Sequence, residues 1–169
     1  MTVVVSRKET ELKIYLASSW RNPHQGEVLA QLRASGHEVY DFRNPALDNT
    51  GFHWSNVDPQ LREDLTPQRL RRALAHPIAQ QGFGYDVGAM RWAEGCVLLL
   101  PCGLSAHLEA GWMAGAGKPV VVLAPEIREP ELMYKLFDMS IDGTNFTPIC
   151  ESVTELLAHL SIIDPPHSP

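Results

Sequence analysis

Two apolar runs with a helical segment between them constrain the fold of this 169-residue chain more than any other feature. The runs cover residues 97–100 and 120–123, and a Pro/Gly break follows the first. A helix is predicted to begin near Ser105, and residues 117–119 (Gly, Lys, Pro) precede the second run. Continuous apolar runs of this length are typical of strands buried on both faces. The pattern therefore predicts one strand–helix–strand crossover of a parallel sheet.

Alternating strand and helix patterns continue on both sides of this unit. They predict strands over residues 12–17 and 37–42, and helices over residues 23–35, 67–76, 86–94 and 152–160. Gly36 ends the first helix, Ser152 and Glu155 form a Ser-x-x-Glu cap for the last, and Asp142 with Gly143 predicts a turn. The predicted fold class is α/β: a three-layer sandwich around four or five parallel strands, flavodoxin-like or Rossmann-like.

The length of the chain fits one domain, and we predict a single domain over residues 1–169. We predict an irregular insertion over residues 43–66 and a frayed tail over residues from about 162 to 169. The insertion contains Phe52 and Trp54, whose rings could cover a planar ligand or equally could pin the loop to the core. Residues 67–76 carry Arg69, Arg71 and Arg72, which predict a solvated basic face.

Charge, apolar runs, cysteine spacing and missing motifs argue against several kinds of ligand and location. The net charge of −6 disfavours binding to a nucleic acid polymer, and no apolar run approaches the length of a membrane span. The cysteines at 96, 102 and 150 lack both disulfide and zinc spacing, so we expect no metal site. No Gly-x-Gly-x-x-Gly follows the first strand, which disfavours flavin or dinucleotide binding, and we expect no cofactor. Without a signal-peptide pattern at the N-terminus, the predicted location is the cytoplasm.

Glu109 is the anomaly of the central unit, because it places a carboxylate in a helix otherwise rich in Leu, Ala, Gly, Trp and Met. Ionising a carboxylate on an apolar face costs several kcal/mol unless something offsets it. The helix dipole or a hydroxyl such as that of Tyr15 could do so. A partly desolvated carboxylate at the carboxyl edge of a parallel sheet could act as a nucleophile. The alternative, which composition alone favours, is a solvent-facing glutamate near a helix start.

Other candidates flank this position. Ser18, Ser19, Arg21 and Asn22 follow the first predicted strand, at the edge of a parallel sheet where ligands bind. Asp86 stands at the predicted start of the helix over residues 86–94, where it could serve only as an N-cap.

Together these motifs resemble the nucleoside 2-deoxyribosyltransferase superfamily, which includes deoxynucleoside 5'-monophosphate N-glycosidases. The likeness covers residues 12 to 123 and rests on residues 13–19, Asp86, residues 105–112 and residues 117–120. It implies a retaining double displacement in which Glu109 attacks the anomeric carbon, Asp86 assists the departing base and Tyr15 positions the nucleophile. A second base or water would then release the sugar.

The match departs from the family at Gly103, where the transferases carry an acidic residue and the nucleotide hydrolases a serine that contacts phosphate. Ser105 or main-chain amides could substitute there, and Arg21 matches an arginine of the phosphate-binding hydrolases. Three functions therefore stay open: sugar transfer between nucleobases, hydrolysis of a nucleoside 5'-monophosphate, and nucleotide binding without catalysis. The resemblance, together with the bare helix stripe of Gly111 and Gly115, implies a homodimer or a larger homo-oligomer.

Overall fold

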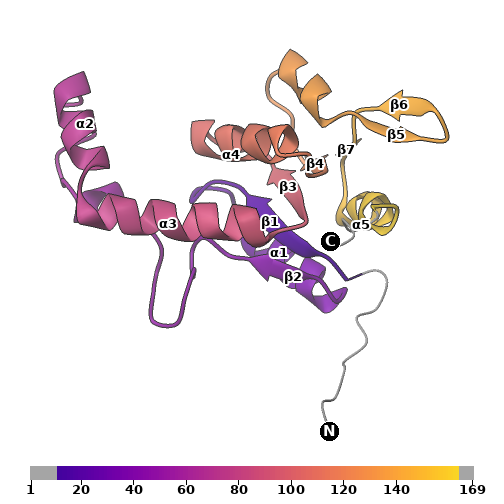
Figure 1. Cartoon of the computed structure of the whole chain (residues 1–169), viewed down its shortest axis with the longest axis horizontal. Helices are drawn as coiled ribbons and strands as arrows, with labels where there is room; N and C mark the ends of the chain where they lie inside the picture. Colours follow the sequence, from indigo (N-terminus) through magenta and orange to yellow (C-terminus); the bar gives the residue numbers. More distant parts are fainter. Residues whose placement is uncertain (1–10, 164–169) are drawn as a thin grey trace, which may run out of the picture. The chain divides into compact units, whose positions relative to one another are not determined.

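The computed structural model describes residues 11–163, which divide into two compact units (Figure 1). The sheet unit comprises residues 11–40 and 93–163, and the helical unit comprises residues 41–92. Of the predicted tail, residues 164–169 lie outside the described residues, whereas Ile162 is the C-cap of α5 and Ile163 is buried in the core cluster. Whether the chain behaves as a single domain stays a prediction.

Five parallel strands form the centre of the sheet unit, in the order β2-β1-β3-β4-β7. They are β1 (Lys13–Ala17), β2 (Glu38–Tyr40), β3 (Gly95–Leu99), β4 (Val120–Leu123) and β7 (Ile149–Cys150). The strands predicted from the apolar runs are confirmed, although β2 is shorter than expected. The two-residue edge strand β7 was not predicted, because a segment that short carries no periodicity.

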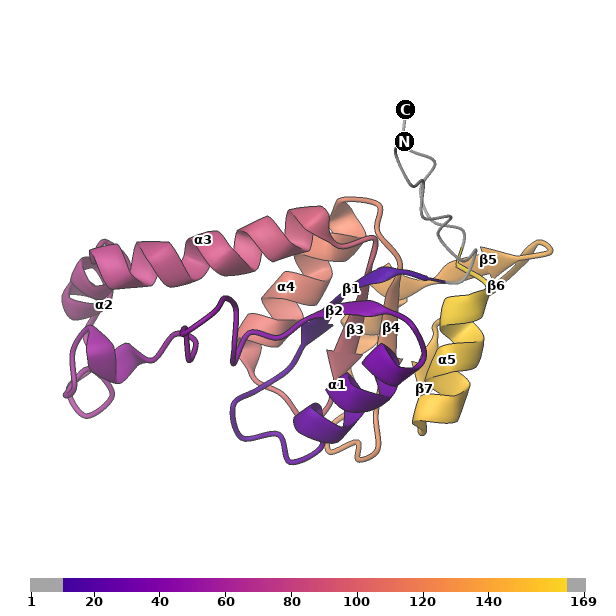
Figure 2. The same ribbon diagram turned by 90° about the horizontal axis from the view of Figure 1, so that it is seen from below.

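Helices cover both faces of this sheet. They are α1 (Gln25–Ala34), α4 (Leu104–Gly115) and α5 (Val153–Ser161). Side chains of α1 and α5 pack into one core cluster, whereas α4 packs against β3, β1 and β4 from the other side (Figure 2). The sheet unit is therefore a three-layer α/β sandwich of the Rossmann-like class, as the sequence predicted.

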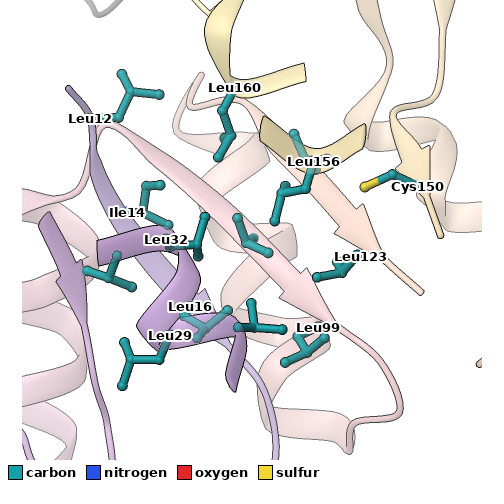
Figure 3. Packing of buried hydrophobic residues seen from close by; sticks show 14 of the residues in the cluster. Leu12, Ile14, Leu16, Leu29, Leu32, Leu99, Leu123, Cys150, Leu156 and Leu160 are labelled. Atoms are coloured by element: carbon teal, nitrogen blue, oxygen red, sulfur yellow. The ribbon is translucent and has the colours of Figure 1, made fainter. Parts of the chain in front are cut away.

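Alternation along the strands determines which residues face which helices. Ile14 and Leu16 of β1 and Val97 and Leu99 of β3 point into the cluster with α1 and α5 (Figure 3). Each of these side chains is fully buried, and such burial stabilises the fold by roughly 1.5 to 3 kcal/mol per residue. The intervening Tyr15 consequently faces the α4 side of the sheet.

Local signals at the ends of these elements behave as predicted. Gly36 adopts a φ of +96° just after α1, a conformation that favours glycine. The Ser152 hydroxyl accepts a hydrogen bond from the Glu155 amide at 3.3 Å, while the Glu155 carboxylate accepts one from the Glu151 amide at 2.8 Å. The predicted cap of α5 is thus confirmed, with the carboxylate reaching one residue further back than in a standard capping box.

Between β4 and β7 the chain forms a short helix and a hairpin. These elements are the 3-10 helix η2 (Leu132–Phe137) and the antiparallel strands β5 (Met139–Ile141) and β6 (Thr144–Phe146). Asp142 and Gly143 connect the strands with φ values of +50° and +77°, which identifies the predicted turn as the two-residue type with both central residues left-handed.

The helical unit contains one short 3-10 turn and two α-helices, η1 (Trp54–Asn56), α2 (Pro67–Leu74) and α3 (Pro77–Trp92). The prediction that a helix begins at Asp86 is wrong, because Asp86 lies in the interior of α3 and cannot be its N-cap. Pro77 starts this helix instead of ending the previous one, since its fixed φ suits a first helical turn. Gly82 and Gly84, which precede the predicted start, lie inside α3 and cost about 1 kcal/mol each relative to alanine.

One of those glycines has a packing reason. A β-carbon on Gly82 would lie 2.9 Å from the Phe52 β-carbon, so only glycine lets the Phe52 ring approach α3 this closely. The Trp54 ring in turn meets Phe52 edge to face, with centroids 4.8 Å apart. Contacts within the helical unit therefore hold both rings of the predicted insertion.

Arg69 also differs from its predicted role as part of a solvated basic face. Its guanidinium pairs with Asp58 at 2.6 Å and with Asp64 at 2.7 Å, which ties the start of α2 to the preceding loop. The same guanidinium lowers the pKa of Asp58 by hydrogen bonding. Across residues 11–163, every helix is too short or too polar to cross a bilayer.

Candidate functional site

The strand order of the sheet unit reverses direction between β1 and β3. From β1 the chain passes through α1 to β2 on one side, whereas from β3 it passes through α4 to β4 on the other. In open parallel sheets such a reversal leaves a crevice outside the carboxyl ends of the two strands, and ligands bind there. The candidate site is therefore built from the loop after β1 (residues 18–22), the loop after β3 (residues 100–103) and α4.

Hydrogen bonds join these two loops. The Asn22 amide nitrogen donates to the Leu99 carbonyl at 3.3 Å and to the Pro101 carbonyl at 3.1 Å. The Ser18 hydroxyl also donates to the Leu99 carbonyl, at 3.3 Å. Asn22 is only 3% exposed, so its amide hydrogens serve the protein's own main chain. The structure thus shows a structural contact for Asn22 at this edge, and its predicted ligand contact stays a prediction.

The remaining predicted polar residues of the site are more accessible. Arg21 and Ser105 are exposed, and Ser19 is half-buried and accepts a hydrogen bond from the Arg21 amide at 3.1 Å. Gly103, the N-cap of α4, has an extended backbone and provides no side-chain cap. The first turn of α4 therefore begins without the side-chain acceptor that most helices have.

Glu109 is half-buried and lies on the flank of α4, beside the stripe of Ala106, Ala110 and Met113 that packs on the sheet. At helical spacing Glu109 shares a face with Trp112 and Met113, so it is directed inward if that face meets the sheet. Met113 is indeed buried, but Trp112 is 44% exposed, so Glu109 lies at the boundary between the two sides of the helix. Glu109 also lies beyond the first turn, where the effect of the helix dipole has faded. A hydrogen bond is therefore the better candidate for stabilising its ionised form.

The charge of Glu109 acts on two nearby thiols. Burial, and after it the Glu109 charge, raises the pKa of Cys102 to about 12, and the same two causes raise the pKa of Cys96. Both thiols therefore stay protonated near neutral pH and are poor nucleophiles. Cys96 pairs in register with Tyr15, and both residues face the α4 side of the sheet. The structure thus brings Tyr15 and Glu109 to one face of the sheet unit.

Tyr15 is held firmly in this position. It is 1% exposed, and its ring stacks on that of Tyr40, its register partner on β2, with centroids 5.4 Å apart. The three other predicted residues, Asp86, Phe52 and Trp54, belong to the helical unit. Their meeting with Glu109 stays a prediction.

His107, a residue of α4, makes two ring contacts beside the site. Its Nδ1 lies 3.0 Å from the Gly103 carbonyl, and its Nε2 lies 3.0 Å from the Tyr134 hydroxyl. Because a carbonyl only accepts, the bond to Gly103 requires a proton on Nδ1, and Nε2 lies within hydrogen-bond distance of the Tyr134 hydroxyl. The two rings are stacked, with an interplanar angle of 6°. His107 thereby ties the start of α4 to η2, a partner that no sequence spacing reveals.

Among residues 11–163, His, Cys, Asp and Glu side chains form no group of three that could hold a metal ion.

Comparison with known proteins identifies the fold. No family model matches the chain, and no curated protein matches it. A solved structure does match: the 2-deoxyribosyltransferase of the psychrotolerant bacterium Bacillus psychrosaccharolyticus, with a TM-score of 0.51 and 20% sequence identity. The match covers 89% of this chain and 97% of that one. That protein is described as a biocatalyst for the synthesis of antiviral and antitumoral nucleosides. The α/β fold of the present chain is thus the fold of a 2-deoxyribosyltransferase, which agrees with the resemblance drawn from its motifs.

Proposed function

We propose that the protein is an enzyme that cleaves the N-glycosidic bond of a (deoxy)nucleoside and transfers the sugar to another nucleobase. One observation carries the proposal. Glu109 is a half-buried carboxylate of the helix that covers the face of the sheet to which Tyr15 points, and its charge acts on Cys96, the register partner of Tyr15. The solved structure of similar fold is a 2-deoxyribosyltransferase, and this supports nucleoside chemistry at that edge.

In the first step of the proposed reaction, a Glu109 carboxylate oxygen forms a bond to the anomeric carbon of the sugar. The bond from that carbon to the base nitrogen breaks, and its electron pair leaves with the base, which takes a proton from Asp86. The negative charge of Glu109 stabilises the oxocarbenium-like transition state on the way to a glycosyl ester.

In the second step, a nitrogen of another base attacks the same carbon from the opposite side. The ester bond to Glu109 breaks, the carboxylate is restored, and the proton of the incoming base returns to Asp86. Two inversions give overall retention of configuration. When water replaces the second base, the same sequence hydrolyses the substrate.

The other residues of the site have proposed roles in binding and orientation. The buried, stacked ring of Tyr15 gives its hydroxyl a fixed position from which to orient Glu109. Ser19, Arg21, Ser105 and the main chain at Gly103 would contact the sugar and its 5' end. Phe52 and Trp54 would cover the base. The reaction needs no cofactor.

A mixed-substrate assay tests this function. The protein is incubated with a deoxynucleoside plus a different free base, and separately with nucleoside 5'-monophosphates, and the products are separated by chromatography. We expect a new nucleoside from the wild type, a loss of roughly 10³-fold or more in Glu109→Gln, and no loss in Glu126→Gln, which changes an exposed carboxylate. Full activity of Glu109→Gln would remove Glu109 from the mechanism.

The same assay separates the three functions that the sequence left open. Free base and sugar phosphate from a monophosphate, without a new nucleoside, would assign hydrolysis. Ligand binding by calorimetry without any product would assign a binding module. The intact mass of the quenched wild-type enzyme should increase by the mass of the bound sugar, and that of Glu109→Gln should not.

A further inference from the structure

Asn22 connects two segments that are far apart in sequence. Its amide nitrogen bonds carbonyl groups 77 and 79 residues further along the chain, at Leu99 and Pro101. Its amide oxygen accepts from the His24 main-chain N–H at 2.8 Å, which fixes the turn that precedes α1. One buried side chain thus holds the end of the β1 loop and the beginning of the β3 loop together.

The segment that Asn22 holds leads directly into the helix that carries Glu109. Leu99 is the last residue of β3, and Pro101 lies two residues before Gly103, the N-cap of α4. Because Gly103 gives α4 no side-chain cap, the place of its first turn depends on contacts from outside the helix. Asn22 and Ser18 contact the residues before this turn from the loop after β1, and the Leu100 amide donates to the Leu123 carbonyl of β4.

From this arrangement we infer that Asn22 is a positioning residue: it fixes the entry to α4, and through it Glu109, against the loop after β1. What the positioning serves rests on the proposed function. Nucleophilic attack requires the carboxylate oxygen and the sugar carbon to meet at about 3 to 3.5 Å, and a misplacement of about 1 Å can cost 10²-fold in rate. Loss of the two bonds should therefore slow the chemical step more than it weakens substrate binding.

Two variants separate these bonds from the local turn. Asn22→Asp keeps the shape of the side chain and an acceptor for the His24 N–H, but it cannot donate to Leu99 or Pro101. Asn22→Ser keeps a short acceptor for the same N–H without burying a charge, so it serves if the aspartate variant does not fold. The matched control is His37→Ala, because His37 is also buried and accepts a bond from the Leu12 amide at the opposite edge of the sheet.

The experiment measures base release under single-turnover conditions together with hydrogen exchange of the main-chain amides of residues 100–106. We expect the rate of base release to fall by about 10- to 100-fold in the Asn22 variants, with KM changed by less than about threefold. Exchange at residues 100–106 should rise in the same variants. His37→Ala should change neither quantity at a temperature where it is folded.

Each other outcome overturns the inference in a distinct way. Unchanged hydrogen exchange with a reduced rate of base release would make Asn22 a substrate contact. Raised exchange with an unchanged rate would show that the hydrogen bonds of Asn22 do not matter to the reaction. An equal effect of His37→Ala would reduce both results to general destabilisation. If the wild type releases no base, the proposed function fails, whereas unchanged exchange in the Asn22 variants would contradict the positioning itself.

Discussion

The contacts within the sheet unit differ in kind from the contacts within the helical unit. The apolar cluster that α1 and α5 form with the sheet lies in the sheet unit and draws on all five of its strands. In the helical unit the specific contacts are an aromatic pair, a glycine that admits it, and the ion pairs of Arg69. The comparison teaches that the proposed nucleophile stands on the unit whose helices pack on a buried sheet, whereas the proposed cover for the base belongs to the unit that carries the aromatic pair and the ion pairs.

The largest expected effect tests the apolar core. Leu16→Ala removes a fully buried side chain from the centre of the cluster and should lower the free energy of unfolding by about 2 to 5 kcal/mol. Leu47→Ala, a change of the same chemistry at a residue of the helical unit that is 94% exposed, should stay within about 0.5 kcal/mol. Urea unfolding followed by circular dichroism measures both values. Similar losses in the two variants would erase the distinction between the units.

The next effect tests the aromatic contact of the helical unit. In Gly82→Ala the new methyl group meets Phe52 and should destabilise by about 1 to 3 kcal/mol. Gly88→Ala in the same helix meets no atom within 4 Å and should stabilise by up to about 1 kcal/mol. Hydrogen exchange along α3 and the thermal midpoint report the two changes. An improvement of stability in Gly82→Ala would show that Phe52 moves aside freely.

A smaller effect concerns pH and the amino edge of the sheet unit. Burial lowers the pKa of His37 below its ordinary value of 6.5, and the charge of Glu11 opposes part of that shift. The unfolded chain therefore takes up the proton at a higher pH than the folded protein. The stabilisation is complete above pH 6.5 and is lost as the pH falls from there towards the folded pKa, with a slope of at most about 1.4 kcal/mol per pH unit.

His37→Asn provides the control for this pH dependence, because its side-chain oxygen can accept from the Leu12 amide without titrating. Urea midpoints between pH 5 and 8 should fall more steeply with acid in the wild type than in His37→Asn. Parallel curves would remove His37 as the titrating group.

The smallest effect is expected at the ion pairs of Arg69. Arg69→Gln breaks its bonds to Asp58 and Asp64, and because these groups are partly exposed, the global unfolding midpoint should barely change. Main-chain hydrogen exchange between residues 58 and 73 should increase, and added salt should reduce the difference from the wild type. Arg71→Gln, an exposed neighbour in α2, should leave exchange unchanged. A large fall in the unfolding midpoint would show that these ion pairs contribute to global stability as a buried core contact does.

Where local chemistry decides the structure, the sequence predicts it well. Residues 97–100 and 120–123 could hardly form anything but buried strands, and Gly36, Ser152 and the Asp142–Gly143 pair mark their elements through backbone conformation or capping. The start of α3 was missed because Pro77 fits both the end of one helix and the start of another. The contact with Phe52 explains the glycine at position 82, and this contact could not be predicted from the local sequence.

The candidate site divides in the same way. Spacing placed Glu109 on the helix after the central strand and Tyr15 on its neighbour, and the structure brings both to one face. The bonds of Asn22 and the contact of His107 with Tyr134 could not be predicted, because their partners are distant in sequence or are main-chain atoms that have no residue signature.

The choice of main-chain oxygens as the partners of Asn22 has a consequence for how this region tolerates mutation. A carbonyl group is present whatever the side chain, so these bonds place no demand on the identity of the residues at 99 and 101, while position 22 must supply two donors and an acceptor at once. In a library that substitutes each position in turn, the need to keep these bonds should therefore restrict the residue at position 22 only.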